Sequence, residues 1–70
     1  MKFKPPAAMF KIRSETSTAL RYITIHGGDI EGYYGYISTE SYDGDIIGET
    51  EEYDKCGEAK LAAIEVANKL

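Results

Sequence analysis

Hydrophobic and polar residues alternate along several short segments of this 70-residue chain. A period of two is typical of strands that bury one face. In residues 20–26 the alternation puts Ile23 and Ile25 on one face, while Tyr22, Thr24 and His26 share the other. The other segments are likewise rich in the β-branched and aromatic residues that strands favour. We therefore predict strands at residues 9–13, 20–26, 33–39 and 46–50.

The stretch GGDIEGYYGYI at residues 27–37 is rich in glycine, which raises the question of a phosphate-binding loop. Its glycines match neither common phosphate-loop spacing, and strand-like residues follow them where a helix would be needed. No lysine is nearby, and Asp29 and Glu31 would repel a phosphate. We therefore predict a hairpin turn formed by Gly27, Gly28 and Asp29.

Two further glycines shape the region that follows. Asp43-Gly44 is the strongest local turn signal, because this pair adopts the positive φ angles of a two-residue type I′ hairpin turn. Gly35 lies inside a predicted strand, where a missing side chain leaves room for a bulge or a neighbouring ring.

Small and apolar residues recur at helical spacing in the last part of the chain. Asp54 is the predicted N-cap, with its carboxylate accepting hydrogen bonds from the first turn. The alanines would let the helix approach a sheet closely. The predicted fold is α+β, a four-stranded antiparallel meander followed by one C-terminal helix packed on one face (ββββα). The other face has no second layer within the chain. The expected buried face of the helix comprises Cys56, Ala59, Ala63, Ile64, Val66, Ala67 and Leu70.

The chain is short enough for one domain, which we place at residues 8–70 after a loose basic arm at residues 1–7. A single cysteine, Cys56, excludes a disulfide framework and favours a reducing compartment, so we expect a cytoplasmic protein. The N-terminal residues have neither the apolar core of a signal peptide nor a membrane span.

Charge is distributed unevenly along the sequence. Residues 1–21 carry five basic side chains and one acid, whereas residues 29–54 carry nine acids and no Lys, Arg or His. Tyrosines, which are enriched at protein interfaces, are interleaved with those acids. The acids would oppose direct nucleic-acid binding, but they would steer a basic partner.

We therefore predict a non-enzymatic protein-binding domain with no cofactor and no metal. Its partner would be a basic, nucleic-acid-handling protein, and its sharpest form would be an inhibitor that mimics nucleic acid, as anti-restriction or anti-CRISPR proteins of phages do. The predicted partner-binding residues are Asp29, Glu31, Tyr33, Tyr34, Tyr36, Glu40, Tyr42, Asp43, Asp45, Glu49, Glu51 and Glu52.

Residues 43–68, DGDIIGETEEYDKCGEAKLAAIEVAN, resemble the YegP-like small domains. The resemblance implies an antiparallel sheet with a helix, sometimes paired, and no defined activity. The chain departs from the family in having no Trp and in its segment YYGYIST. The resemblance supports an alternative, a self-associating module that forms a homodimer through the uncovered sheet face. The matching positions are Gly44, Ile46, Ile47, Tyr53, Ala59, Ile64 and Val66.

The sequence gives weaker support to two other kinds of site, a cysteine nucleophile and a calcium-binding loop. Cys56 in the first turn of the helix would be a candidate nucleophile if the only histidine, His26, lay close to it. Asp43 and Asp45 begin a spacing like that of an EF-hand loop, but an apolar Ile47 stands where an oxygen ligand belongs. A buried small cysteine and a hairpin turn explain these residues better.

Overall fold

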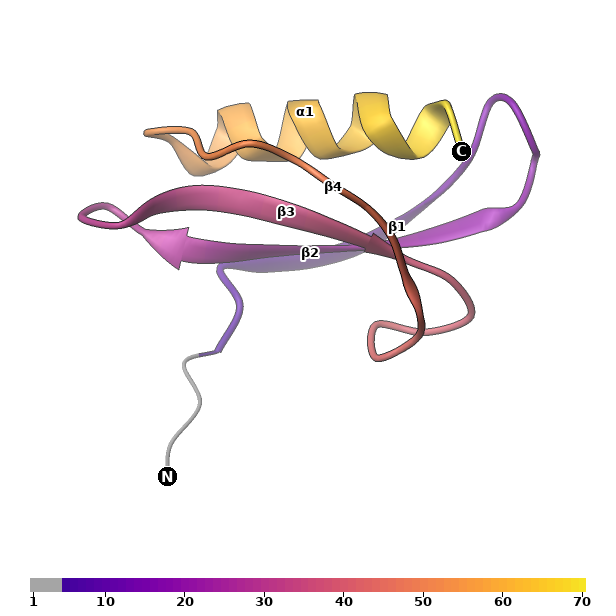
Figure 1. Cartoon of the computed structure of the whole chain (residues 1–70), viewed down its shortest axis with the longest axis horizontal. Helices are drawn as coiled ribbons and strands as arrows, with labels where there is room; N and C mark the ends of the chain where they lie inside the picture. The colour runs from indigo at the N-terminus through magenta and orange to yellow at the C-terminus, as the bar shows by residue number, and fades with distance from the viewer. Residues whose placement is uncertain (1–4) are drawn as a thin grey trace.

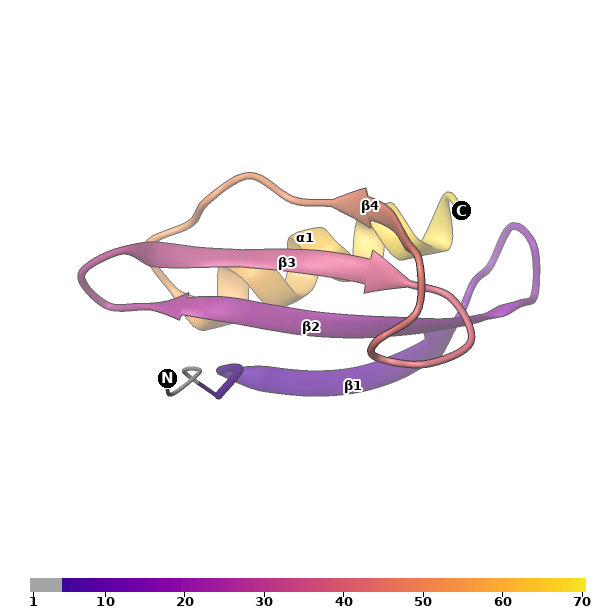
Figure 2. The same cartoon turned by 60° about the horizontal axis from the view of Figure 1, so that its bottom comes forward.

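The computed structural model describes residues 5–70 and shows an antiparallel sheet covered on one side by a helix (Figure 1). The strands pair in the order β1-β2-β3-β4 (Figure 2), so the predicted α+β meander followed by a helix is confirmed. Residues 1–4 of the predicted basic arm lie outside the described residues. The elements are β1 Ala8–Arg13, β2 Leu20–Gly28, β3 Gly32–Ser38, β4 Ile46–Glu49 and α1 Cys56–Asn68.

The core lies between α1 and one face of the sheet. Phe10 pairs with Ile23, and Ile23 pairs with Ile37, so these apolar residues align across three strands on one face. Ile23, Ile25 and Ile37 are fully buried there. Each such burial contributes roughly 1.5–3 kcal/mol, and the predicted alternation of residues 20–26 is confirmed.

Close contact between α1 and the sheet depends on small residues on both sides. Ala59, Ala63 and Ala67 are fully buried against the sheet. A Cβ placed on Gly35 would lie 3.1 Å from the Ala63 Cβ, and one on Gly48 would lie 3.1 Å from the Val66 Cγ1. Gly35 thus makes room for the helix. Of the two roles expected for Gly35, a bulge or space for a neighbouring ring, neither is seen, because the bulge lies between Ile37 and Ser38 of β3 and the neighbour is the helix.

The turn between β2 and β3 is displaced from its predicted position. Gly27 and Gly28 belong to β2, and Gly28 pairs with Gly32, so the turn is formed by residues 29–31. Gly27 has a φ of 109°, and a Cβ there would collide with the Gly32 carbonyl oxygen. The two glycines therefore let the strands close tightly, which is why the pairing extends past His26.

The predicted two-residue turn at Asp43-Gly44 is wrong. Ser38 pairs with Ile46, which leaves residues 39–45 as a longer loop between β3 and β4. The positive φ falls on Glu40, at 67°, and Gly44 does not share it. Gly44 is needed for another reason, since a Cβ there would collide with the Thr39 carbonyl oxygen.

The predicted N-cap of α1 is also wrong. The cap is Lys55, with an extended backbone and no side-chain cap hydrogen bond. Its carbonyl oxygen accepts the first helical hydrogen bonds, from the N–H groups of Glu58 and Ala59 at 3.1 and 3.2 Å. The helix therefore begins one residue too late for Asp54 to cap it.

The loop between β1 and β2 closes the other end of α1. The hydroxyl groups of Ser14 and Thr16 donate to the Asn68 carbonyl oxygen at 3.3 and 2.6 Å. Arg21 Nη2 donates to the Leu70 carbonyl oxygen at 2.7 Å. These bonds satisfy carbonyl groups that a helix end leaves unpaired, and they place a cation where the helix dipole favours one.

The close approach of α1 predicts a strict size limit at Ala63. We expect Ala63→Leu to lower the free energy of unfolding by about 1–3 kcal/mol, because the larger side chain has no space between Gly35 and the helix. Urea unfolding followed by circular dichroism measures this. The control is Leu61→Ala on the exposed side of α1, where Leu61 is 68% exposed and a change within about 0.5 kcal/mol is expected. Equal effects of the two substitutions would contradict the packing described.

Candidate partner-binding surface

The sheet face opposite α1, here called the open face, is the most distinctive surface of the molecule. Strand register places alternate residues of all four strands on it. The loop of residues 39–45 folds over one end of this face (Figure 1), and Pro6, before β1, also lies on this side. The residues of the open face are Met9, Lys11, Arg13, Leu20, Tyr22, Thr24, His26, Tyr34, Tyr36, Ser38, Ile46 and Glu49.

Three rings form a cluster on the open face. His26 stacks on Tyr34 with ring centroids 5.8 Å apart and meets the edge of Tyr36 at 5.5 Å. Tyr34 and Tyr36 meet edge to face at 5.5 Å. Such pairs contribute about 0.5–1.5 kcal/mol each beyond area burial. The cluster therefore holds its rings in place at the surface before any partner binds.

Tyr42 joins the open face from the loop of residues 39–45. Its ring meets the Tyr22 ring edge to face at 5.0 Å. On the same face, Lys11 Nζ lies 5.9 Å from the centroid of the Tyr22 ring. The contact with Tyr22 fixes the position of the loop over β1 and β2, although Tyr42 is remote from them in sequence.

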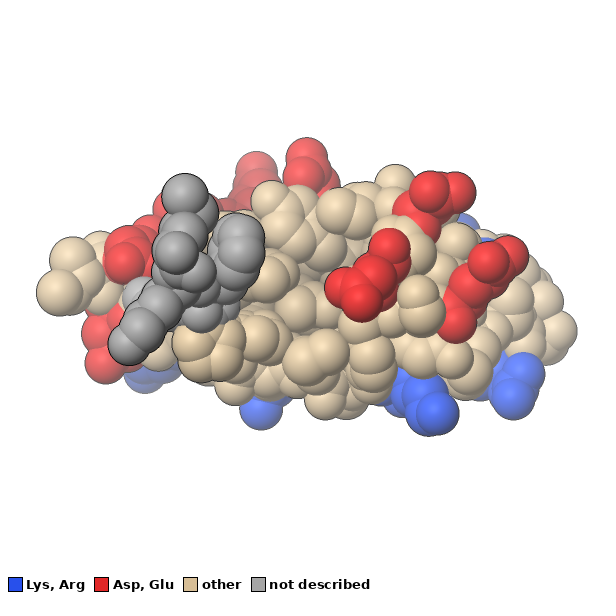
Figure 3. Space-filling model, turned by 90° about the horizontal axis from the view of Figure 1, so that it is seen from below, with Lys and Arg blue, Asp and Glu red and all other residues tan. Residues whose placement is uncertain are grey.

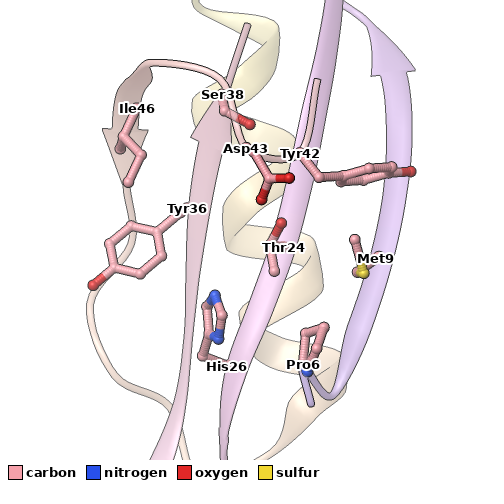
Figure 4. Close-up of a pocket in the computed structure, with 9 residues that line it drawn as sticks. All are labelled: Pro6, Met9, Thr24, His26, Tyr36, Ser38, Tyr42, Asp43 and Ile46. Atoms are coloured by element: carbon pink, nitrogen blue, oxygen red, sulfur yellow. The ribbon is translucent and has the colours of Figure 1, made fainter. Parts of the chain in front are cut away.

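Two hollows open on this side of the molecule. The first, the Asp43 hollow, has a volume of about 240 Å³ (Figure 4) and is lined by Pro6, Met9, Thr24, His26, Tyr36, Ser38, Tyr42, Asp43 and Ile46. The second, the acidic hollow, has a volume of about 460 Å³ and is lined by Glu31, Tyr34, Glu49, Thr50, Glu51 and Glu52. Tyr36 lines one and Tyr34 lines the other, so the ring cluster contributes to both.

Charges of opposite sign lie along opposite sides of the open face. Figure 3 shows this face with basic residues along one edge, acidic residues along the other edge and toward both ends, and mostly uncharged residues between them. The basic edge is β1, with Lys11 and Arg13 exposed. The acidic side comprises β4 with the segment after it and the loop of residues 39–45. A partner that covers the middle therefore meets both signs.

The structure divides the predicted partner-binding residues into groups. Tyr34 joins Glu31, Glu49, Glu51 and Glu52 in the acidic hollow, and Tyr36, Tyr42 and Asp43 meet in the Asp43 hollow. Glu40 and Asp45 are exposed in the loop but line neither hollow. Tyr33 is separate, because it packs against the core on the helix side and donates its hydroxyl hydrogen to Asp29 at 2.7 Å.

Several residues of this surface were missing from the predicted set. They are His26, Tyr22, Thr24 and Met9. The signal for three of them was in the sequence, because the alternation of residues 20–26 puts Tyr22, Thr24 and His26 on one face. Met9 lies at an alternate position of β1 with Lys11 and Arg13, so these three residues share one face of the strand.

The arrangement offers no Cys–His pair for nucleophilic catalysis. Cys56 packs at the edge of the core on the helix side of the sheet, whereas His26 lies on the open face. The sheet therefore separates the thiol from the imidazole. Within residues 5–70, no group of three or more His, Cys, Asp or Glu side chains is arranged to hold a metal ion.

Comparisons of this chain with protein-family models, with curated proteins and with solved structures found no match. The resemblance of residues 43–68 to YegP-like domains therefore stays a prediction. The helix in the described part of the chain lacks the length and the apolar run needed to cross a membrane.

The contact between Tyr33 and Asp29 predicts a pH effect. The hydrogen bond to Asp29 raises the pKa of Tyr33 above its ordinary value, with smaller contributions from desolvation and from the Asp29 charge. The folded chain thus favours neutral Tyr33, a stabilisation that is complete below the ordinary tyrosine pKa of about 10 and is lost as pH rises through the folded value. We expect Asp29→Asn to lower the pKa of Tyr33, measured by NMR titration of ¹³Cζ-labelled tyrosine. An unchanged Tyr33 titration would contradict the contact.

Proposed function

We propose that this chain is a non-enzymatic binding domain whose open face docks onto a basic protein. The observation that carries the proposal is the combination on one rigid surface of pre-arranged rings and carboxylates that line the adjoining hollows. Tyr34 and Tyr36 supply contact area with few rotatable bonds, which makes tyrosine effective at interfaces. Met9 and Ile46 add exposed apolar area, at 49% and 60% exposure.

Electrostatics selects the class of partner. The acidic hollow gathers four carboxylates around Tyr34, and Asp43 lines the second hollow. Such a concentration of negative charge raises the rate at which a basic partner arrives and disfavours acidic ones. A protein that handles nucleic acid is the partner we favour, because carboxylates spaced over a rigid sheet present negative charge as phosphates do. Inhibition by mimicry of nucleic acid is the sharpest form of this proposal.

Self-association is a second candidate, favoured by the opposite charges of the two edges. If a two-fold axis ran parallel to the strands between two facing open faces, β1 of one copy would lie over β4 of the other. Lys11 and Arg13 would then face Glu49 and the acids after it. Such a dimer would use the same patch twice, as two-fold interfaces do.

Charge reversal tests the proposal that a basic protein binds the open face. We expect Glu49→Lys, Glu51→Lys and Glu52→Lys together to weaken capture of basic proteins by about tenfold or more at low salt, because the steering field is lost. The measurement is affinity capture from nuclease-treated lysate at low and high salt, with the captured proteins identified by mass spectrometry. The matched control reverses three acids exposed outside the open face, Glu15, Glu58 and Glu65. Equal losses in both triple variants would contradict a binding site on the open face.

A single substitution separates the two candidates. Lys11→Glu removes a cation from the β1 edge, so it should strengthen binding of a basic partner and weaken a charge-paired dimer. Sedimentation equilibrium of the parent and of Lys11→Glu gives the oligomeric state, and the same capture experiment gives partner binding. A dimeric parent that becomes monomeric in Lys11→Glu, without stronger capture, would favour self-association over the basic partner.

A further inference from the structure

The Asp43 hollow has the size of a site for one side chain. Its volume of about 240 Å³ is below the roughly 300–1,000 Å³ of pockets that hold drug-sized ligands. It lies where the loop of residues 39–45 folds over the open face, between β1 and β4 (Figure 4). The hollow thus combines residues from all four strands and a loop, with Thr24 of the central strand β2 at its base.

The walls of the hollow suit a long side chain with a polar end. Met9 and Ile46 face it from β1 and β4, and the rings of Tyr36, Tyr42 and His26 surround the space between them. Two of these rings belong to the cluster on the open face. The third, Tyr42, is held by its contact with Tyr22. The walls are therefore formed before anything binds, which lowers the entropic cost of binding.

Asp43 gives the hollow its charge. In Figure 4 its carboxylate extends over the space above Thr24, between Tyr36 and Tyr42. No Lys or Arg side chain is among the described residues that line the hollow. Within residues 5–70, the Asp43 carboxylate takes part in no ion pair or hydrogen bond. Its oxygens are thus available to a donor from outside.

We propose that the Asp43 hollow binds the side chain of an arginine from the basic partner, an inference that rests on the proposed function. A guanidinium group is planar, stacks on aromatic rings and presents two parallel N–H groups to a carboxylate. Its attraction to a ring face adds to the charge pairing with Asp43. The apolar stem of arginine packs against Met9 on the β1 side of the hollow. Lysine, a compact and strongly hydrated charge, matches flat walls less well.

Short peptides test this inference. The probe is Gly-Gly-Arg-Gly-Gly with blocked ends, and the controls replace arginine by citrulline, which has nearly the same shape without charge, or by lysine. Binding is followed by ¹⁵N–¹H NMR of the whole chain. We expect the arginine peptide to shift the amide signals of Thr24, Ser38 and Asp43 and to bind at least about tenfold more tightly than the citrulline peptide. Equal binding of the arginine and citrulline peptides would overturn the inference.

A pair of variants tests the role of Asp43. We expect Asp43→Asn to weaken arginine-peptide binding about tenfold, whereas Asp45→Asn, two residues away in the same loop but outside the hollow, changes it less than twofold. Both remove one exposed carboxylate, so a general effect of net charge would move them equally and would overturn the inference. A lysine peptide that binds as tightly as the arginine peptide would overturn the choice of arginine.

Different outcomes distinguish an arginine site in the Asp43 hollow from the proposed binding of a basic protein. If Asp43→Asn leaves capture of the basic protein unchanged while reversal of Glu49, Glu51 and Glu52 abolishes it, the proposed function stands and the hollow is not the arginine site. If neither change affects capture and the arginine peptide shifts no signal, both are wrong.

Discussion

The close packing of α1 on one face of the sheet is the constraint on which the rest of the structure depends. Three alanines of the helix pack against a sheet surface on which Gly35 and Gly48 have no side chains. The short distance lets a small core exclude water, which a 70-residue chain needs because it buries only about 60% of its unfolded surface. Because its one helix packs on this face, the described chain has no second layer for the other face, of which the loop of residues 39–45 covers one end.

The side chains of the open face hold one another in fixed positions. Its rings are held by one another, and Tyr42 adds a ring carried by the loop of residues 39–45. The edge strands carry opposite charges, basic on β1 and acidic beside β4. A face of this kind, rigid in its middle and charged around it, has the composition of a protein interface. The core and the candidate site are thus consequences of the same layering: one face stabilises the fold and the other is free to bind.

Much of the fold could be predicted because alternation and helical spacing report burial directly. The strands and the apolar face of α1 follow from residues such as Ile23, Ile25 and Ala63. The turns could not be predicted, since the bulge at Ile37 and Ser38 changes how many residues the loop before β4 contains. The site was predicted less well. Alternation along the strand is enough to place Tyr33 and Tyr34 on opposite faces of the sheet. The Asp43 hollow, in contrast, exists only because the loop of residues 39–45 folds back onto Tyr22. No local sequence pattern encodes that contact.

We propose that the open face, and not the helix, contacts the partner. Photo-crosslinking tests it most directly, with p-benzoylphenylalanine placed either at Ile46, on the open side, or at Leu61, on the outer side of α1. The two sites are similarly exposed, at 60% and 68%, so exposure alone would label both. We expect crosslinks to a basic protein from position 46 and none from position 61. Crosslinks from position 61 alone, or from neither position, would contradict it.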